Sequence, residues 1–140
     1  MRSVLLDVNV VLDVLLESDE HVEASAAIWE LIETGKVRGF LAAHAITTIH
    51  YLVRKHVGTE SRATKIIGSL LAIFRVAPVD QAVIEQAIQL SAPNFEDAVT
   101  AAAAHRAHCE VIVTRDLKGF QKSPVPAVTP ETAVHLIETW

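Results

Sequence analysis

The stretch Ser3-Val4-Leu5-Leu6-Asp7-Val8-Asn9 joins an apolar run of strand length directly to a carboxylate. The run 4–6 has no alternation between apolar and polar side chains, which is typical of a strand buried on both faces of a parallel sheet. Asp7 therefore follows the carboxyl end of that strand, the edge at which open α/β sheets bind ligands. Acidic groups that follow other strands of the same sheet would meet Asp7 at this edge.

The size and composition of the chain favour one globular domain over residues 1–140, long enough to bury roughly two-thirds of its unfolded surface. A charged fraction of 21% and a net charge of −5 exclude a generally basic surface, so any contact with nucleic acid must be local. The single Cys109 excludes an intramolecular disulfide and favours a reducing compartment. Because neither a membrane span nor a secretory signal is visible, we expect a cytoplasmic protein.

Apolar spacing predicts that strands and helices alternate along the chain. After Asp7, apolar residues at helical spacing predict a helix, with Asn9 as its N-cap. Four later helices have predicted N-caps: Thr59, Asp80, Asn94 and Thr129. The later elements are predicted as helices over 22–32, 46–53, 60–72, 82–90, 95–107 and 130–140, and as strands over 39–43, 74–77, 111–114 and 124–128. This alternation predicts an α/β fold with three layers and a central, mainly parallel sheet.

Acidic residues stand where two of the buried strands end and where one helix begins. Asp7 and Asp116 follow strands, and Glu96 and Asp97 lie in the first turn of an alanine-rich helix. If the strands are neighbours, these carboxylates converge and raise one another's pKa unless a cation lies among them. Oxygen ligands suit Mg²⁺ or Mn²⁺, and such an ion suits phosphodiester hydrolysis because it activates water and stabilises the leaving oxygen.

The same residues also have interpretations without a function. Glu96 and Asp97 would stabilise a helix simply by lying near the positive end of its dipole. Asp116 could begin a turn. Asp7 is the hardest to explain in this way, because it directly ends a buried strand.

Several blocks of the sequence resemble the signature blocks of the PIN (PilT N-terminal) domain family. They are 5–13 (LLDVNVVLD), 94–98 (NFEDA) and 111–116 (VIVTRD) with Phe120, and the closing 124–131 (PVPAVTPE) is similar to the end of many such chains. No single block is specific, but their order and spacing together are. The resemblance spans nearly the whole sequence.

This resemblance implies a metal-dependent endoribonuclease, most often the toxin of a VapBC-type toxin–antitoxin pair in a bacterial chain of this size. It implies that Asp7, Asp97 and Asp116 are catalytic and bind Mg²⁺ or Mn²⁺, and that Asn9 and Thr114 accompany them. It also implies an RNA substrate, a homodimer, and an antitoxin that blocks the acidic pocket.

One position departs from the family pattern. Members with the full acidic set usually carry a glutamate on the helix after the second strand, where this chain has His50. His50 could bind Mn²⁺ or Zn²⁺, act as a general base near neutral pH, or leave a weak or inactive site. The alternative is a partly buried helix histidine without a function. Glu96 could add a carboxylate beside Asp97.

Basic residues close to the predicted site favour contacts with a nucleic-acid backbone. Arg115 and Lys118 flank Asp116 and are predicted to bind RNA phosphates. The denser basic cluster over 54–65 is explained equally well by a solvated helix face. The group His105, His108 and Cys109 has no second pair at the spacing of a zinc site, which disfavours zinc.

Two other functions remain open at this stage. The first is a catalytically silent PIN-like module that binds RNA or a partner protein, since His50 replaces the usual glutamate. The second is an unrelated metal phosphatase on an α/β fold. Cleavage of RNA would exclude the first, and indifference to RNA with hydrolysis of small phosphate esters would support the second.

Overall fold

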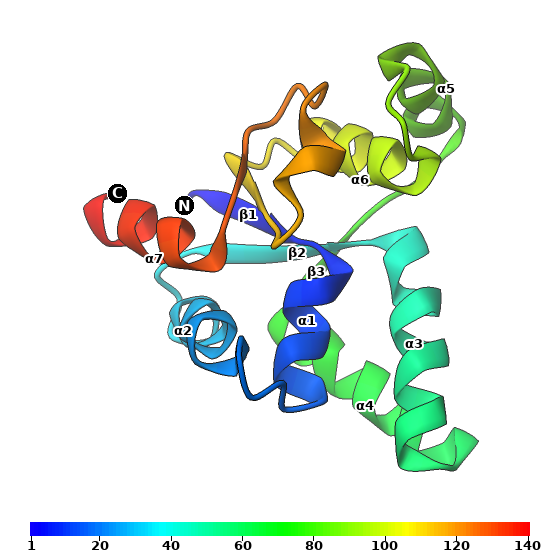
Figure 1. The fold of residues 1–140 in the computed structure, drawn as a ribbon, viewed down its shortest axis with the longest axis vertical. Coiled ribbons are helices and arrows are strands. Elements are labelled where there is room, and N and C mark those ends of the chain that lie inside the picture. The colour runs from blue at the N-terminus through cyan, green and yellow to red at the C-terminus, as the bar shows by residue number, and fades with distance from the viewer.

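A five-stranded parallel sheet forms the centre of the computed structural model, which describes all residues from 1 to 140 (Figure 1). The strands are β1 (Ser3–Leu6), β2 (Arg38–Ala42), β3 (Arg75–Ala77), β4 (Val111–Val113) and β5 (Ala127–Val128). They lie in the order β3-β2-β1-β4-β5, and every neighbouring pair is parallel. The carboxyl end of β1, which leads to Asp7, therefore lies between the ends of β2 and β4.

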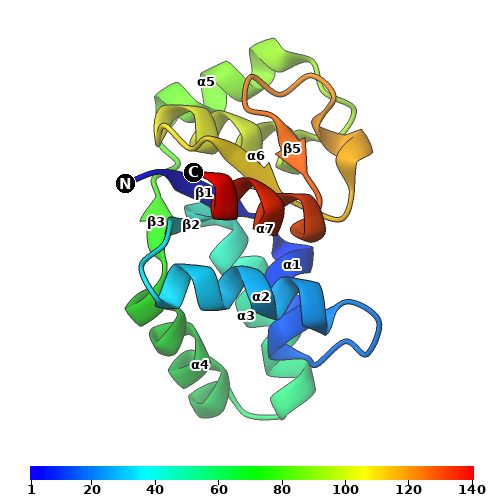
Figure 2. The same ribbon diagram turned by 90° about the vertical axis from the view of Figure 1, so that its left-hand side faces the viewer.

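Helices cover both faces of this sheet. They are α1 (Val8–Leu15), α2 (Val22–Glu33), α3 (Ala43–Val57), α4 (Glu60–Ile73), α5 (Gln81–Leu90), α6 (Phe95–Arg106) and α7 (Pro130–Thr139), with a short 3-10 helix η1 (Leu117–Phe120). α1 to α4 lie on one side of the sheet, and α5 and α6 lie on the other (Figures 1 and 2). The predicted α/β fold with three layers is confirmed. None of the helices combines the length and the apolar character needed to cross a membrane.

The apolar run that opens the chain is buried on both faces, as predicted. Val4 and Leu6 pack into the core formed with α1 to α4 and α7, whereas Leu5 points to the opposite core, which contains α5 and α6. All four residues of β1 are buried. Since successive side chains of a strand point to opposite faces, an uninterrupted apolar run is what two separate cores require.

Side-chain caps fix most helix starts, and one cap differs from the prediction. Four predicted caps each accept a hydrogen bond from the backbone N–H three residues ahead: Thr59, Asp80, Asn94 and Thr129. For α1, the prediction of Asn9 was wrong. Asp7 is the N-cap and accepts from the Val8 N–H at 2.9 Å, and Asn9 lies inside the helix. The chain passes from β1 into α1 through Asp7 alone, so the helix begins at Val8, directly before the residue that was predicted as its cap.

Candidate active site

Asp7 is held at the centre of the sheet edge by three hydrogen bonds. Its N–H donates to the Val113 carbonyl at 2.9 Å and so continues the pairing of β1 with β4. Its Oδ1 accepts from the Val8 N–H, and its Oδ2 accepts from the Thr114 hydroxyl, both at 2.9 Å. One donor on each oxygen fixes the orientation of the carboxylate and leaves acceptor capacity on both oxygens.

Thr114 and Asn9 connect Asp7 to the loop that carries Asp116. Thr114 is fully buried, and its Oγ1 accepts from the Asp116 N–H at 3.0 Å and from the Asn9 Nδ2 at 3.4 Å. The Asn9 Oδ1 accepts from the Arg115 N–H at 3.2 Å. The structure therefore brings together Asp7, Asn9, Thr114 and the start of the loop after β4. This network sets where Asp116 lies.

Asp97 reaches the same region from the first turn of α6, where its N–H donates to the Asn94 Oδ1 at 3.0 Å. Gly119 of η1 lies directly against its carboxylate. A Cβ added to Gly119 would collide with the Asp97 Oδ2 and would lie 3.7 Å from the Asp116 Oδ2. The absence of a side chain at Gly119 therefore leaves the space in which the carboxylate of Asp97 lies.

The carboxylates of the site influence one another's ionisation. Burial raises the pKa of Asp7, the Thr114 hydroxyl lowers it in part, and the charges of Glu96 and Asp116 raise it further. Burial also raises the pKa of Asp97 to about 6, with further contributions from Asp7, Asp116 and Glu96. Four negative side chains therefore share one region, as the sequence predicted for acidic groups at this edge.

The donor types fit a hard divalent cation. No three His, Cys, Asp or Glu side chains lie close enough together to hold a metal ion as they stand. Burial nevertheless raises the pKa of Asp97, and the negative charges of Asp7, Asp116 and Glu96 raise it further. Carboxylate oxygens are the ligands that Mg²⁺ and Mn²⁺ prefer, and a cation would offset this repulsion. The negative charge of these side chains and their oxygen ligand atoms thus suit Mg²⁺ or Mn²⁺.

His50 is directed toward α4. Its Nε2 lies 2.9 Å from the Glu60 Oε1, and Arg54 lies 3.7 Å from the other oxygen of the same carboxylate. The side chain of His50 also lines a cavity of about 230 Å³ together with Ile46 and Ile67. The partner of His50 is thus Glu60 rather than a carboxylate of the sheet edge. That His50 lines the acidic site stays a prediction.

Arg115 forms an ion pair with the buried carboxylate of Asp13, a residue that was not predicted to belong to the site. Its Nε and Nη2 donate to the two oxygens of Asp13 at 2.9 and 3.1 Å, and the Ser25 hydroxyl donates to the same carboxylate at 2.9 Å. Asp13 is 2% exposed. Its only signal in the sequence is a charge within the apolar face of a helix. Lys118 is exposed in η1, and RNA binding by Arg115 and Lys118 stays a prediction.

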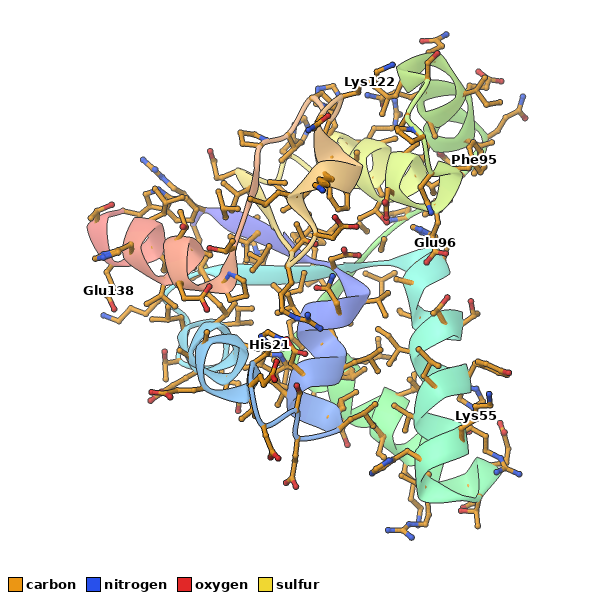
Figure 3. The ribbon with its side chains drawn as sticks, in the orientation of Figure 1. His21, Lys55, Phe95, Glu96, Lys122 and Glu138 are labelled. Atoms are coloured by element: carbon orange, nitrogen blue, oxygen red, sulfur yellow. The ribbon has the colours of Figure 1, made fainter.

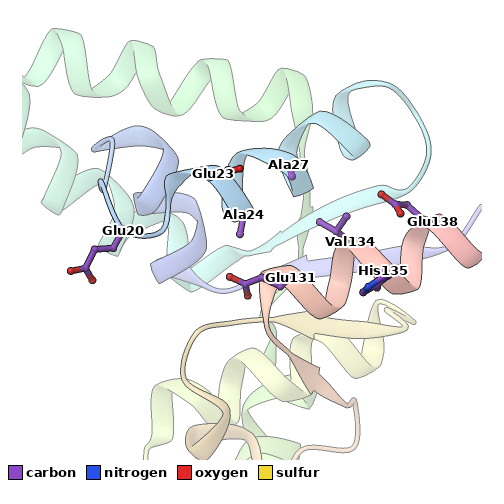
Figure 4. A pocket seen from close by; sticks show the side chains of 8 residues that line it. All are labelled: Glu20, Glu23, Ala24, Ala27, Glu131, Val134, His135 and Glu138. Atoms are coloured by element: carbon purple, nitrogen blue, oxygen red, sulfur yellow. The ribbon is translucent and has the colours of Figure 1, made fainter.

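The largest cavity of the molecule lies away from this edge. It measures about 510 Å³ and lies between α2 and α7 (Figure 4). Four glutamates surround it: Glu20, Glu23, Glu131 and Glu138. The largest cavity and the carboxyl groups with raised pKa values, Asp7 and Asp97, therefore lie in different places, and the candidate site is the one around Asp7 and Asp97.

Substituting Gly119 by alanine tests whether the site needs this close approach. The new Cβ should displace the carboxylate of Asp97 and weaken Mn²⁺ binding by about tenfold or more, measured by calorimetry. Gly68→Ala is the control, because nothing lies within 4 Å of a Cβ added on that part of α4. The control should keep the affinity of the parent protein and gain up to about 1 kcal/mol of stability. Equal Mn²⁺ affinity in all three proteins would contradict the prediction.

The raised pKa of Asp97 predicts a pH-dependent stability of the metal-free protein. The carboxyl group titrates near 3.8 when unfolded and at about 6 when folded, so the folded state binds the extra proton between these values. The free energy of unfolding therefore falls as the pH rises from about 4 to about 6. Asp97→Asn should be more stable than the parent protein above pH 6 by about 1 kcal/mol, a value reduced for solvent screening of a partly exposed group.

Urea unfolding of both proteins in a chelator, at several pH values across this window, measures the difference. It should vanish at about pH 3 and below, where the Asp97 carboxyl is largely protonated in both states. A difference that is independent of pH would show that the substitution acts through something other than this ionisation.

The site and the fold together define an α/β protein with an open parallel sheet and a carboxylate cluster at its carboxyl edge. A family model described as the PIN domain matches residues 3–118. The chain belongs to the PIN domain family.

Solved structures show the same fold. The chain is similar to the DNA-bound VapBC complex from Salmonella typhimurium (TM-score 0.72, 16% identity, 93% of this chain and 99% of that chain). It is also similar to FitAcB from Neisseria gonorrhoeae (TM-score 0.70, 20% identity, 91% and 97%). A third match is VapC20 from Mycobacterium tuberculosis, a toxin that cleaves the sarcin–ricin loop (TM-score 0.62, 16% identity, 78% and 86%). Comparison with curated protein sequences gives no match.

Proposed function

We propose that this PIN domain is a metal-dependent endoribonuclease and the toxin of a VapBC-type toxin–antitoxin pair. The observation that carries the proposal is the group of four carboxylates at one sheet edge, in which burial and then the charges of Asp7, Asp116 and Glu96 raise the pKa of Asp97. The similarity of the fold to VapC20, which cleaves an RNA loop, supports the substrate class.

Asp7, Asp97 and Asp116 are the residues that would hold Mg²⁺ or Mn²⁺. When bound, such an ion lowers the pKa of an attacking water and stabilises negative charge on a phosphodiester. The Thr114 hydroxyl orients the carboxylate of Asp7, and Asn9 and Thr114 together hold the loop of Asp116. Glu96 adds negative charge to the same region.

RNA cleavage under controlled metal conditions tests the proposal. The purified protein is incubated with a structured RNA in a chelator, then with added Mg²⁺ or Mn²⁺, while calorimetry measures metal binding. We expect fragments only when a divalent cation is present, at concentrations close to the measured Kd. Cleavage that the chelator leaves unchanged, or metal binding without any cleavage of structured or single-stranded RNA, would contradict it.

A silent binding module is the second candidate, and the position of His50 favours it. The residue that replaces the usual glutamate is paired with Glu60 and does not add a negative ligand to the site. This candidate predicts RNA or protein binding that neither cleaves RNA nor changes when Mn²⁺ is added. The third candidate, a metal phosphatase, predicts hydrolysis of p-nitrophenyl phosphate and no effect on RNA.

An antitoxin partner and a homodimer complete the proposal. The similar structures include toxin–antitoxin complexes, and two of these are described as bound to DNA. Co-expression with a neighbouring small open reading frame should yield a complex in which cleavage is inhibited. Light scattering on the isolated chain should give twice the mass of one chain.

A further inference from the structure

His44 lies at the same sheet edge as Asp7, and neither the acidic cluster nor the family pattern accounts for it. It is the second residue of α3, directly after β2, and β2 pairs with β1 in the sheet. Like Asp7, His44 is a polar residue close to the carboxyl end of a strand, from which only Ala43 separates it. The sequence alone does not distinguish His44 from other helix histidines, because its partners Thr100 and Glu96 are more than 50 positions away.

One ring nitrogen of His44 contacts the first turn of α6. Its Nε2 lies 3.2 Å from the Thr100 Oγ1 and 3.3 Å from the carbonyl oxygen of Glu96. The Thr100 hydroxyl donates its own hydrogen to the same carbonyl at 3.1 Å. The oxygen of Thr100 is thus left to accept, so the hydrogen between these two side chains must come from His44.

The other ring nitrogen fixes the tautomer. The Nδ1 of His44 is buried and has no hydrogen-bond partner. A buried N–H without an acceptor is rarer and less favourable than an unused lone pair. The hydrogen therefore resides on Nε2, and the imidazole is a neutral donor aimed at Thr100 and Glu96.

These contacts connect α3 to the turn of α6 that carries Asp97. Asn94 caps this turn from within its own helix, at 3.0 Å from the Asp97 N–H, whereas His44 holds it from the neighbouring helix. Glu96 lies where the start of α6 meets the first turn of α3 (Figure 3). A shift of this turn would carry Asp97 with it, because the two residues are adjacent.

We propose that His44 is a positioning residue for this site: as a neutral Nε2 donor to Thr100 and to the Glu96 carbonyl, it sets the distance between Asp97 and Asp7. The effect of His44 on metal binding and cleavage rests on the proposed function. Its effect on the first turn of α6 does not, and this turn can be observed in the metal-free protein.

Four variants test the proposal: His44→Ala, His44→Gln, Thr100→Val and, as a control, His135→Ala on the exposed face of α7. Glutamine keeps an N–H donor near the place of the histidine Nε2. The first readout is hydrogen exchange of the Asp97 and Ala98 amides without metal, which are bonded to Asn94. The others are the Mn²⁺ Kd by calorimetry and the separate effects on kcat and KM.

In His44→Ala, we expect exchange of these two amides to quicken by about tenfold and Mn²⁺ affinity to fall by about tenfold. The kcat for RNA cleavage should fall while KM changes little. Thr100→Val should change amide exchange, Mn²⁺ affinity and kcat in the same directions, but less strongly. His44→Gln should restore most of the loss, and His135→Ala should match the parent protein.

Three results would overturn the proposal. They are exchange that quickens evenly over the whole chain, a Mn²⁺ Kd that is unchanged in His44→Ala, and a glutamine variant that behaves as the alanine variant does. If the parent protein binds no Mn²⁺, the proposed function fails. The exchange of the Asp97 amide in His44→Ala and His44→Gln still decides whether His44 holds the turn.

Discussion

Arg115→Met should lower the free energy of unfolding by about 3 kcal/mol. The two guanidinium hydrogen bonds to Asp13, at 2.9 and 3.1 Å, are lost, and a carboxylate that is only 2% exposed is left with Ser25 as its donor. Removing one partner of a buried ion pair is strongly destabilising, because the remaining charge stays in a poorly solvating environment. Urea unfolding at neutral pH, followed by circular dichroism, measures the change.

Two further variants distinguish a structural role of Arg115 from contact with RNA. Lys118→Met removes an exposed charge from η1 and should change stability by no more than about 0.5 kcal/mol. Asp13→Leu combined with Arg115→Met should recover much of the lost stability, since no uncompensated charge remains. If Arg115→Met instead folds as stably as the parent protein but loses affinity for RNA, Arg115 acts on phosphate as the sequence predicted.

Asp7→Asn should reduce metal-dependent RNA cleavage by about a thousandfold or more, because it removes the negative charge at the centre of the site. The same variant should be at least as stable as the parent protein without metal. Burial raises the pKa of Asp7, so its ionised form is disfavoured in the folded state and a neutral amide removes this penalty. Cleavage rates and urea unfolding curves measure the two effects on the same preparations.

The opposite signs of these effects make the prediction specific. A variant that loses both activity and stability would indicate that Asp7 acts mainly through its two accepted hydrogen bonds, from the Val8 N–H and the Thr114 hydroxyl, because an amide has only one oxygen to accept them. Retention of more than about a tenth of the activity would show that Asp7 is not essential to the chemistry. Asp80→Asn is a suitable control, since Asp80 is also a helix N-cap, at the start of α5, where it accepts from the Val83 N–H.

Features of the fold that depend on neighbours in the sequence were predictable. The uninterrupted apolar run 4–6 predicted burial on both faces, and the residue types at Thr59, Asp80, Asn94 and Thr129 predicted where four helices begin. The gathering of acidic groups at one edge followed from the rule that parallel strands end on the same side.

Features that depend on contacts between distant parts of the chain were not predictable. Asp13 and Arg115 are separated by 102 positions, and His44 and Thr100 by 56. A glycine is needed at position 119 because the carboxylate of Asp97 lies where a Cβ would be, and not because the backbone has a conformation that only glycine adopts. This close approach cannot be recognised from an isolated glycine in the sequence. The orientation of His50 depends on Glu60, which belongs to the next helix.

The sheet has short outer strands. β3 has three residues and β5 only two, and these are the strands with a free edge. A second chain that added its own strand to either side would gain very few backbone hydrogen bonds, which protects the molecule from edge-to-edge aggregation. We therefore expect copies of this chain that associate to do so through the outer surfaces of their helices rather than through a sheet shared between molecules.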